Sequence, residues 1–141
     1  MWPNEIAEKM GPFLLGMIDS MLVDGMDYVI EGEAMLPQVV ADLVEKHPDQ
    51  IKVVFVGYTE IDVEDKVALV KKFSDGDSDW LTSKSDKYIR DHVGNMIAYS
   101  KMIKEGCKKH GVPYFDTSED FSGAIEAATD FLVLGSARAL K

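Results

Sequence analysis

The chain has 141 residues, of which 46% are hydrophobic and 28% charged, and it is expected to form one globular domain over 1–141. Its net charge of −10 argues against nucleic acid or an anionic membrane as a general partner, and no apolar run is long enough to span a membrane. The single cysteine, Cys107, rules out an internal disulfide and fits a cytoplasmic protein. Its position on an apolar helix face predicts a packing role.

A long helical stretch opens the chain. Apolar residues recur every three or four positions from Ile6 to Leu22, which is the spacing of a helix face. Gly11 and Pro12 are expected to break this stretch into a short first helix and a longer second one.

Three β-rich runs follow at intervals along the chain. The strongest is IKVVFVGY, residues 51 to 58, which is apolar on both faces and therefore belongs inside a parallel sheet covered by helices. Strands are expected near residues 27–31, 51–57 and 113–116. Their alternation with helices favours an α/β fold, a three-layer sandwich with a mainly parallel sheet.

Helices are expected between and after these strands, and local residues mark their ends. The turn-rich segment 74–86 is expected to be mobile, and the tail 135–141 to be frayed. Pro37 is expected to open one helix and His47-Pro48 to end it, and Asp62 and Asp65 are expected at the start of the next. A long helix is expected from Lys84 to His110, with Gly111 as its C-terminal stop. Thr117 and Asp120 have the spacing of a capping box before the helix over 121–132.

Polar residues follow each predicted strand. In parallel sheets, ligands bind beyond the carboxyl ends of the strands, so these residues are expected to share one rim. They are Glu31 and Glu33, the stretch 58–60, and the stretch 116–118.

The order of these elements resembles that of small P-loop kinases. The stretches that carry the resemblance are YVIEGEAMLP, VVFVGY, a long helix with an early arginine, and GVPYFDTSEDF before the last helix. More narrowly, the chain resembles nucleotide-kinase-like proteins that phosphorylate small metabolites, which include 2-phosphoglycerate kinase and adenylate kinase relatives. The resemblance covers roughly residues 5 to 134.

The resemblance implies an ATP-dependent phosphotransferase that uses Mg²⁺ and acts on a small metabolite or nucleotide. It places Glu31 at the end of a Walker-B-like strand, near the magnesium or the acceptor. It also implies a lid over residues 74–90, from which Arg90 would reach the transferred phosphate. Glu33 and Lys87 are the corresponding candidates for substrate binding.

The resemblance further implies that the loop after the last strand borders the adenine, which makes Asp116 and Thr117 candidates for cofactor binding. One departure is large: the family begins with a strand and G-x-x-x-x-G-K-[ST], whose backbone and lysine hold the phosphates, and this sequence contains no such motif. The chain therefore resembles such a kinase without its front part, either as a natural short product or as a fragment.

Two other functions are kept open. The chain could be a non-catalytic binding or assembly module of the same fold, or a metal-dependent hydrolase that uses Glu31, Glu33 and Asp116 as ligands. Each candidate residue also has a structural alternative. Arg90 could form a surface ion pair with Asp86 or Asp91, and Lys87 could be solvated.

The absent family strand also predicts an assembly. It would lie between the strands near 28–31 and 52–57, and its loss would leave apolar strand edges with unpaired backbone groups. A homodimer is therefore expected, with an interface at a sheet edge or at the helices spanning Phe13 to Leu22.

Overall fold

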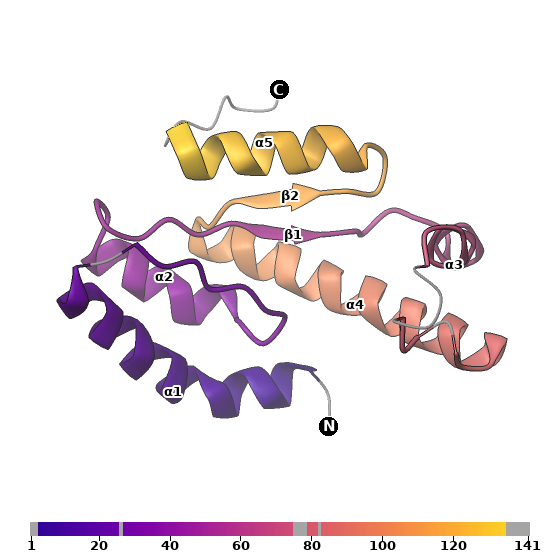
Figure 1. Cartoon of the computed structure of the whole chain (residues 1–141), viewed down its shortest axis with the longest axis horizontal. Helices are drawn as coiled ribbons and strands as arrows, with labels where there is room; N and C mark the ends of the chain where they lie inside the picture. Colours follow the sequence, from indigo (N-terminus) through magenta and orange to yellow (C-terminus); the bar gives the residue numbers. More distant parts are fainter. Residues whose placement is uncertain (1–2, 26, 75–78, 82, 135–141) are drawn as a thin grey trace.

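The computed structural model describes residues 3–25, 27–74, 79–81 and 83–134. This part of the chain forms a mixed α/β fold that is mostly helical, with a small two-stranded parallel sheet packed against helices (Figure 1). The elements in chain order are α1 (Pro3–Asp24), α2 (Pro37–Lys46), β1 (Phe55–Gly57), α3 (Val63–Lys72), α4 (Asp86–His110), β2 (Tyr114–Asp116) and α5 (Phe121–Leu134).

The two strands pair as the sequence predicts, but they are short. Phe55 pairs with Tyr114, Val56 with Phe115 and Gly57 with Asp116, all in the parallel direction. The predicted strand at 113–116 is thus confirmed to within one residue. The strand predicted at 51–57 keeps only its last three residues, because residues 51–54 have no neighbouring strand with which to pair.

Helices pack on the two faces of this sheet. Phe55 and Tyr114 belong to one face and pack against the core cluster that includes Ile103 and Cys107 of α4. Phe115 points to the other face, because successive side chains of a strand alternate, and its ring lies 6.4 Å from that of Phe131 in α5. Figure 1 shows α5 above the strands and α4 below them.

The core consists of two clusters along α4. One joins α1, α2 and the end of α4, and the other joins α3 to the start of α4, so α4 carries most of the packing. The buried residues of the first are Ala7, Leu36, Val40, Ile103, Cys107 and Val112. Those of the second are Val67, Ile89, Val93 and Ile97.

The expected break at Gly11 and Pro12 is wrong, because α1 runs unbroken through both residues. Pro12 removes one backbone donor from the helix, which normally bends or breaks it. Here Pro12 is exposed, so the carbonyl it leaves without a helical partner lies on the water side. Gly11 is buried against α2, where a Cβ would lie 3.8 Å from Val39 Cγ2, an ordinary contact.

The strand predicted near 27–31 is also wrong. These residues form an irregular segment, and Val29, expected to be buried, is 96% exposed. A strand exists only where a neighbour pairs with its backbone. In the described part of the chain, no strand lies next to this segment.

The composition of β1 predicts burial on both faces, but one face is partly exposed. Val56, in its centre, is 45% exposed, because α5 packs mainly on β2. The Phe55 N–H donates to Pro113 O (2.9 Å) and Gly57 O accepts from Thr117 N (2.8 Å), so both residues face β2. The N–H and C=O of Val56 therefore point to the opposite edge, where no described residue pairs with them.

Several helix boundaries are confirmed with their caps. The Asp62 side chain accepts from the N–H groups of Glu64 and Asp65 at the start of α3. Gly111, at φ 67°, ends α4 in the left-handed conformation that glycine adopts without strain. The long helix itself begins two residues later than expected, with Ser85 as its N-cap.

The capping box before α5 is wrong. Thr117 donates to Gly57 O through its hydroxyl (3.1 Å) instead of capping the helix. The cap is Asp120, whose carboxylate accepts from Gly123 N at 3.0 Å.

Of the other expectations, the tail 135–141 and residues 75–78 and 82 of the predicted lid lie outside the described residues. In the part that the structure describes, no helix combines the length and the apolar character needed to cross a bilayer.

Cys107 has the packing role that its spacing predicts, since it is 1% exposed in the core. Burial raises the pKa of its thiol to about 11. We expect the folded protein to react with a disulfide reagent at pH 8 orders of magnitude more slowly than the chain in denaturant, because only the thiolate attacks. Stopped-flow measurement in both conditions tests this, and equal rates would contradict the buried placement.

Candidate functional site

Four polar side chains meet at the carboxyl ends of the two strands. Thr59 follows β1, Asp116 and Ser118 lie at the end of β2, and Lys104 reaches them from α4. We call this group the polar rim cluster. The prediction that the residues after these two strands share one rim is therefore confirmed for the stretches 58–60 and 116–118.

The carboxylate of Asp116 organises the polar rim cluster. Its Oδ2 accepts from Lys104 Nζ at 2.7 Å and from the Thr59 hydroxyl. Its Oδ1 accepts from Ser118 Oγ (2.5 Å), Ser118 N (3.1 Å) and Thr59 N (3.3 Å). Every acceptor position of the carboxylate is thus directed at a protein donor.

The chain around β2 folds so that Ser118 joins the two strand ends. Its hydroxyl accepts from the backbone N–H groups of Thr59 and Glu60, at 2.8 and 2.9 Å. Thr117, which is 8% exposed, adds two bonds from its N–H and its hydroxyl to Gly57 O. The two strand ends are therefore fastened to each other by side chains beyond the last sheet pair.

The charge of Asp116 is stabilised by these partners. Burial alone would raise the pKa of this carboxyl, but the hydrogen bonds from Lys104, Ser118 and Thr59 outweigh it and hold the pKa well below its usual range. The side chain of Asp116 is 24% exposed and that of Lys104 is 44% exposed. The pair is accordingly less screened by water than an ordinary surface ion pair.

A tight contact lies beneath the cluster. A Cβ at Gly57 would come within 2.4 Å of the Tyr114 hydroxyl and 2.9 Å of Ser100 Oγ, so only glycine fits there. The Tyr114 hydroxyl is buried and makes no hydrogen bond of ordinary geometry among the described residues, although an interaction with the Ser100 hydroxyl acts to lower its pKa. Burial, with Asp116 nearby, raises its pKa to about 12.

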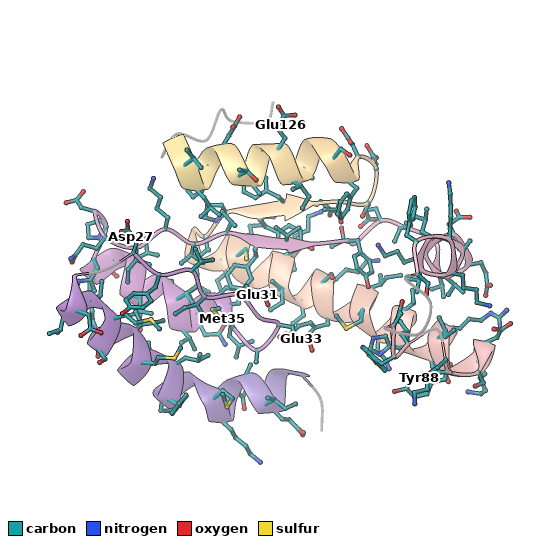
Figure 2. The ribbon with its side chains drawn as sticks, viewed as in Figure 1. Asp27, Glu31, Glu33, Met35, Tyr88 and Glu126 are labelled. Carbon is teal, nitrogen blue, oxygen red and sulfur yellow. The ribbon has the colours of Figure 1, made fainter. Side chains whose placement is uncertain are left out.

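Glu31 and Glu33 lie apart from the hydrogen bonds of the polar rim cluster. Figure 2 shows both on the segment that joins α1 to α2, where both are exposed. Tyr99 OH donates to the backbone O of Glu33 at 3.0 Å. Burial raises the pKa of Tyr58, and the charge of Glu33 raises it further.

Arg90 and Lys87 lie at the start of α4, and both form exposed ion pairs. Arg90 Nε donates to Glu64 Oε1 of α3 at 2.7 Å, so the alternative partners Asp86 and Asp91 were wrong. Lys87 pairs with Asp91, one helical turn away, at 2.5 Å. Pairs this exposed stabilise a protein little, so both side chains can change partner at small cost.

The candidate metal ligands are not gathered into one site. Among the residues that the structure describes, no three histidine, cysteine or acidic side chains are grouped so that they could hold a metal ion. Asp116 is engaged with protein donors, whereas Glu31 has no hydrogen bond or ion pair within the described chain. The hydrolase alternative therefore has no three-ligand centre in this part of the molecule.

Lys104 is the functional candidate that the sequence reasoning missed. It lies on the same stripe of α4 as Ile97, Ser100 and Cys107, at spacings of three and four residues. A lysine and a serine on an otherwise apolar stripe indicate polar partners in the neighbouring layer. That signal was present in the sequence, but it was concealed by the three nearby lysines Lys101, Lys108 and Lys109.

Comparisons with protein-family models, with curated proteins and with solved structures found no match. A role for the polar rim cluster can therefore be inferred only from its own geometry and chemistry.

Proposed function

We propose that the chain is the part of a P-loop-kinase-like phosphotransferase that lies outside the phosphate-binding loop. In this proposal the complete three-layer fold acts with ATP and Mg²⁺ on a small metabolite or nucleotide, and this chain alone is inactive. The parallel order of β1 and β2, their connection through α3 and α4, and the polar strand ends support the proposal. A second polypeptide segment would supply a strand and the missing loop.

The outer edge of β1 is the observation that carries this proposal. Val56 belongs to the most apolar run of the chain, yet its side chain is 45% exposed and its backbone groups face away from β2. An apolar strand normally lies inside a sheet, whereas an edge strand is blunted by charges, proline or a bulge. β1 shares with many edge strands its short length of three residues, but it carries no charge, proline or bulge, and its apolar composition suits a strand with neighbours on both sides.

The described residues fit the two cofactors unequally. The free, exposed carboxylate of Glu31 is the kind of oxygen ligand that Mg²⁺ accepts beside phosphates and water. For the phosphates of ATP there is no glycine-rich loop with a lysine, so they have no cradle in this sequence.

The existing side chains would serve binding and positioning in the complete fold. Arg90 can leave Glu64 at small cost, because that ion pair is exposed, and it could then bind a phosphate with its guanidinium. Lys87 and Glu33 would contact the acceptor substrate. Asp116 and Thr117 would border the nucleotide, while the polar rim cluster holds the two strand ends in register.

Calorimetry with Mg-ATP tests the proposal. The chain alone should show no binding. We would mix it with a designed polypeptide that contains an apolar strand, a G-x-x-x-x-G-K-[ST] loop and a helix. The mixture should bind Mg-ATP, and replacing the lysine of that loop by alanine should remove this binding. Val56→Pro should prevent complex formation, because proline lacks the outward N–H while the bonds of Phe55 and Gly57 to β2 remain. Tight Mg-ATP binding by the chain alone would contradict the proposal.

The non-catalytic alternative also has a specific observation in its favour. Asp116 is saturated by protein donors, and Arg90 and Lys87 are paired, so few polar groups at the strand ends are free to meet a substrate. Under this alternative, the designed polypeptide would bind at the edge of β1 without creating any affinity for Mg-ATP. The same titration therefore separates a kinase-like unit from an assembly module.

A further inference from the structure

The first helix has two apolar stripes, and only one of them faces the rest of the chain. Among the residues of α1 whose burial is described, 5–24, only Ala7 and Gly11 are buried, and they mark the inner stripe. The second stripe lies about 110° around the helix axis from the inner stripe. It comprises Ile6, Met10, Phe13 and Met17, and we call it the outer stripe.

The first three members of the outer stripe are exposed, Met17 is half-buried, and the stripe has the spacing of a helix-pairing seam. Phe13 is 66% exposed, Ile6 40% and Met10 38%. Steps of four, three and four residues between its members are those of the a and d positions of a heptad. Three large apolar side chains exposed on one stripe of one helix indicate an interaction surface, whereas single exposed apolar residues do not.

The charges of α1 indicate what kind of partner fits. The helix carries Glu5, Glu8, Asp19 and Asp24 but only one base, Lys9, so it is unsuited to an anionic membrane surface. From residue 10 to residue 18 it has no charge at all. In a chain with a net charge of −10, this uncharged stretch lets two copies approach each other with little repulsion.

We propose that two copies of the chain form a homodimer through their outer stripes, with the two α1 helices antiparallel. If Phe13 lies opposite Met17 of the second copy, symmetry repeats that contact, and Ile6 lies opposite the other copy's Asp24. Lys9 is then about 4.5 Å along the axis from that aspartate, within reach of an ion pair. A parallel pair would instead place Asp24 beside Asp24. The proposal does not depend on the proposed function.

The mass in solution tests the dimer. Light scattering at tens of micromolar protein should give twice the mass of one chain, and Phe13→Glu should reduce it to the mass of one chain. Phe73→Glu is the matched control, because Phe73 is 72% exposed on another element and should leave the dimer intact. Val56→Pro should also leave it intact. A monomer for the natural chain, or a dimer that Phe13→Glu retains or Val56→Pro abolishes, would overturn the proposal.

Cysteine cross-linking tests the orientation. In the antiparallel pair Met10 lies opposite Ser20 of the second copy, so the double variant Met10→Cys with Ser20→Cys should form an intermolecular disulfide under mild oxidation. Ser20→Cys alone should not, because the two copies of residue 20 lie far apart. Cross-linking by the single variant would show parallel helices and refute the antiparallel arrangement. Circular dichroism of each variant verifies that it is folded.

Discussion

Asp116→Ala should lower the free energy of unfolding by about 3 kcal/mol, because it leaves several donors unpaired at once. Lys104 loses its acidic partner, and the hydroxyls of Thr59 and Ser118 and the backbone N–H of Ser118 lose their acceptor. The Thr59 N–H keeps only its bond to Ser118 Oγ. Asp116→Asn should also be costly, since its NH₂ group would face donors. Chemical denaturation followed by circular dichroism measures both variants.

A matched control separates this effect from the loss of any surface charge. Asp91→Ala removes an acid whose side chain is 61% exposed and, within the described residues, paired with Lys87 alone, and it should cost less than about 0.5 kcal/mol. If the two variants were equally destabilised, Asp116 would not be the organising residue of the polar rim cluster.

The same carboxylate should make stability depend on pH. Its pKa in the folded protein lies below that in the unfolded chain, which is about 4, so the unfolded chain binds a proton first as the pH falls. The contribution of Asp116 is therefore complete above about pH 5 and declines as the pH falls toward the folded-state pKa. Asp116→Ala should lose less stability than the natural chain between pH 5 and pH 2.

Gly57→Ala should destabilise the protein by about 2 kcal/mol, since the added methyl group would overlap the buried Tyr114 hydroxyl. The neighbouring Ser100 hydroxyl, at 2.9 Å from the same position, limits any adjustment. Gly94, at which a Cβ would meet nothing within 4 Å, is the control position. Gly94→Ala should be neutral or stabilising, because alanine favours the helix.

Tyr114→Phe should partly rescue Gly57→Ala. The change removes the atom that the methyl group meets and also removes a buried hydroxyl that makes no hydrogen bond of ordinary geometry within the described residues. In the natural background it should therefore cost nothing or stabilise slightly. A double-mutant cycle measures the coupling between the two positions, and additive effects would contradict the contact.

Local signals in the sequence predicted most helix boundaries. Asp62 and Gly111 act within one turn of the helix that they bound, so their roles can be read from neighbouring residues. Thr117 shows the limit of this reasoning, because the carbonyl of Gly57, distant in sequence, competes successfully for its hydroxyl. Pro12 shows another limit, since its effect depends on whether the affected turn faces water.

Strand pairing could be predicted only in part. The side chains of residues 28–30 have the pattern of a buried strand, but the pattern is the same whether or not a neighbouring strand exists. The hydrogen bonds of Asp116 with Lys104 and Thr59 were also unpredictable in detail, because they join residues from three separate elements. The polar strand ends themselves followed from the parallel arrangement.

Amide hydrogen exchange along β1 most directly tests the claim that this strand has an open edge awaiting another strand. In the chain alone, the Phe55 amide, bonded to Pro113 O, should be protected, and the Val56 amide should exchange at nearly the unprotected rate. Adding the strand–loop–helix polypeptide should protect Val56 and leave Phe55 unchanged. Strong protection of Val56 in the chain alone would mean that the edge is already paired, and that result would contradict the account.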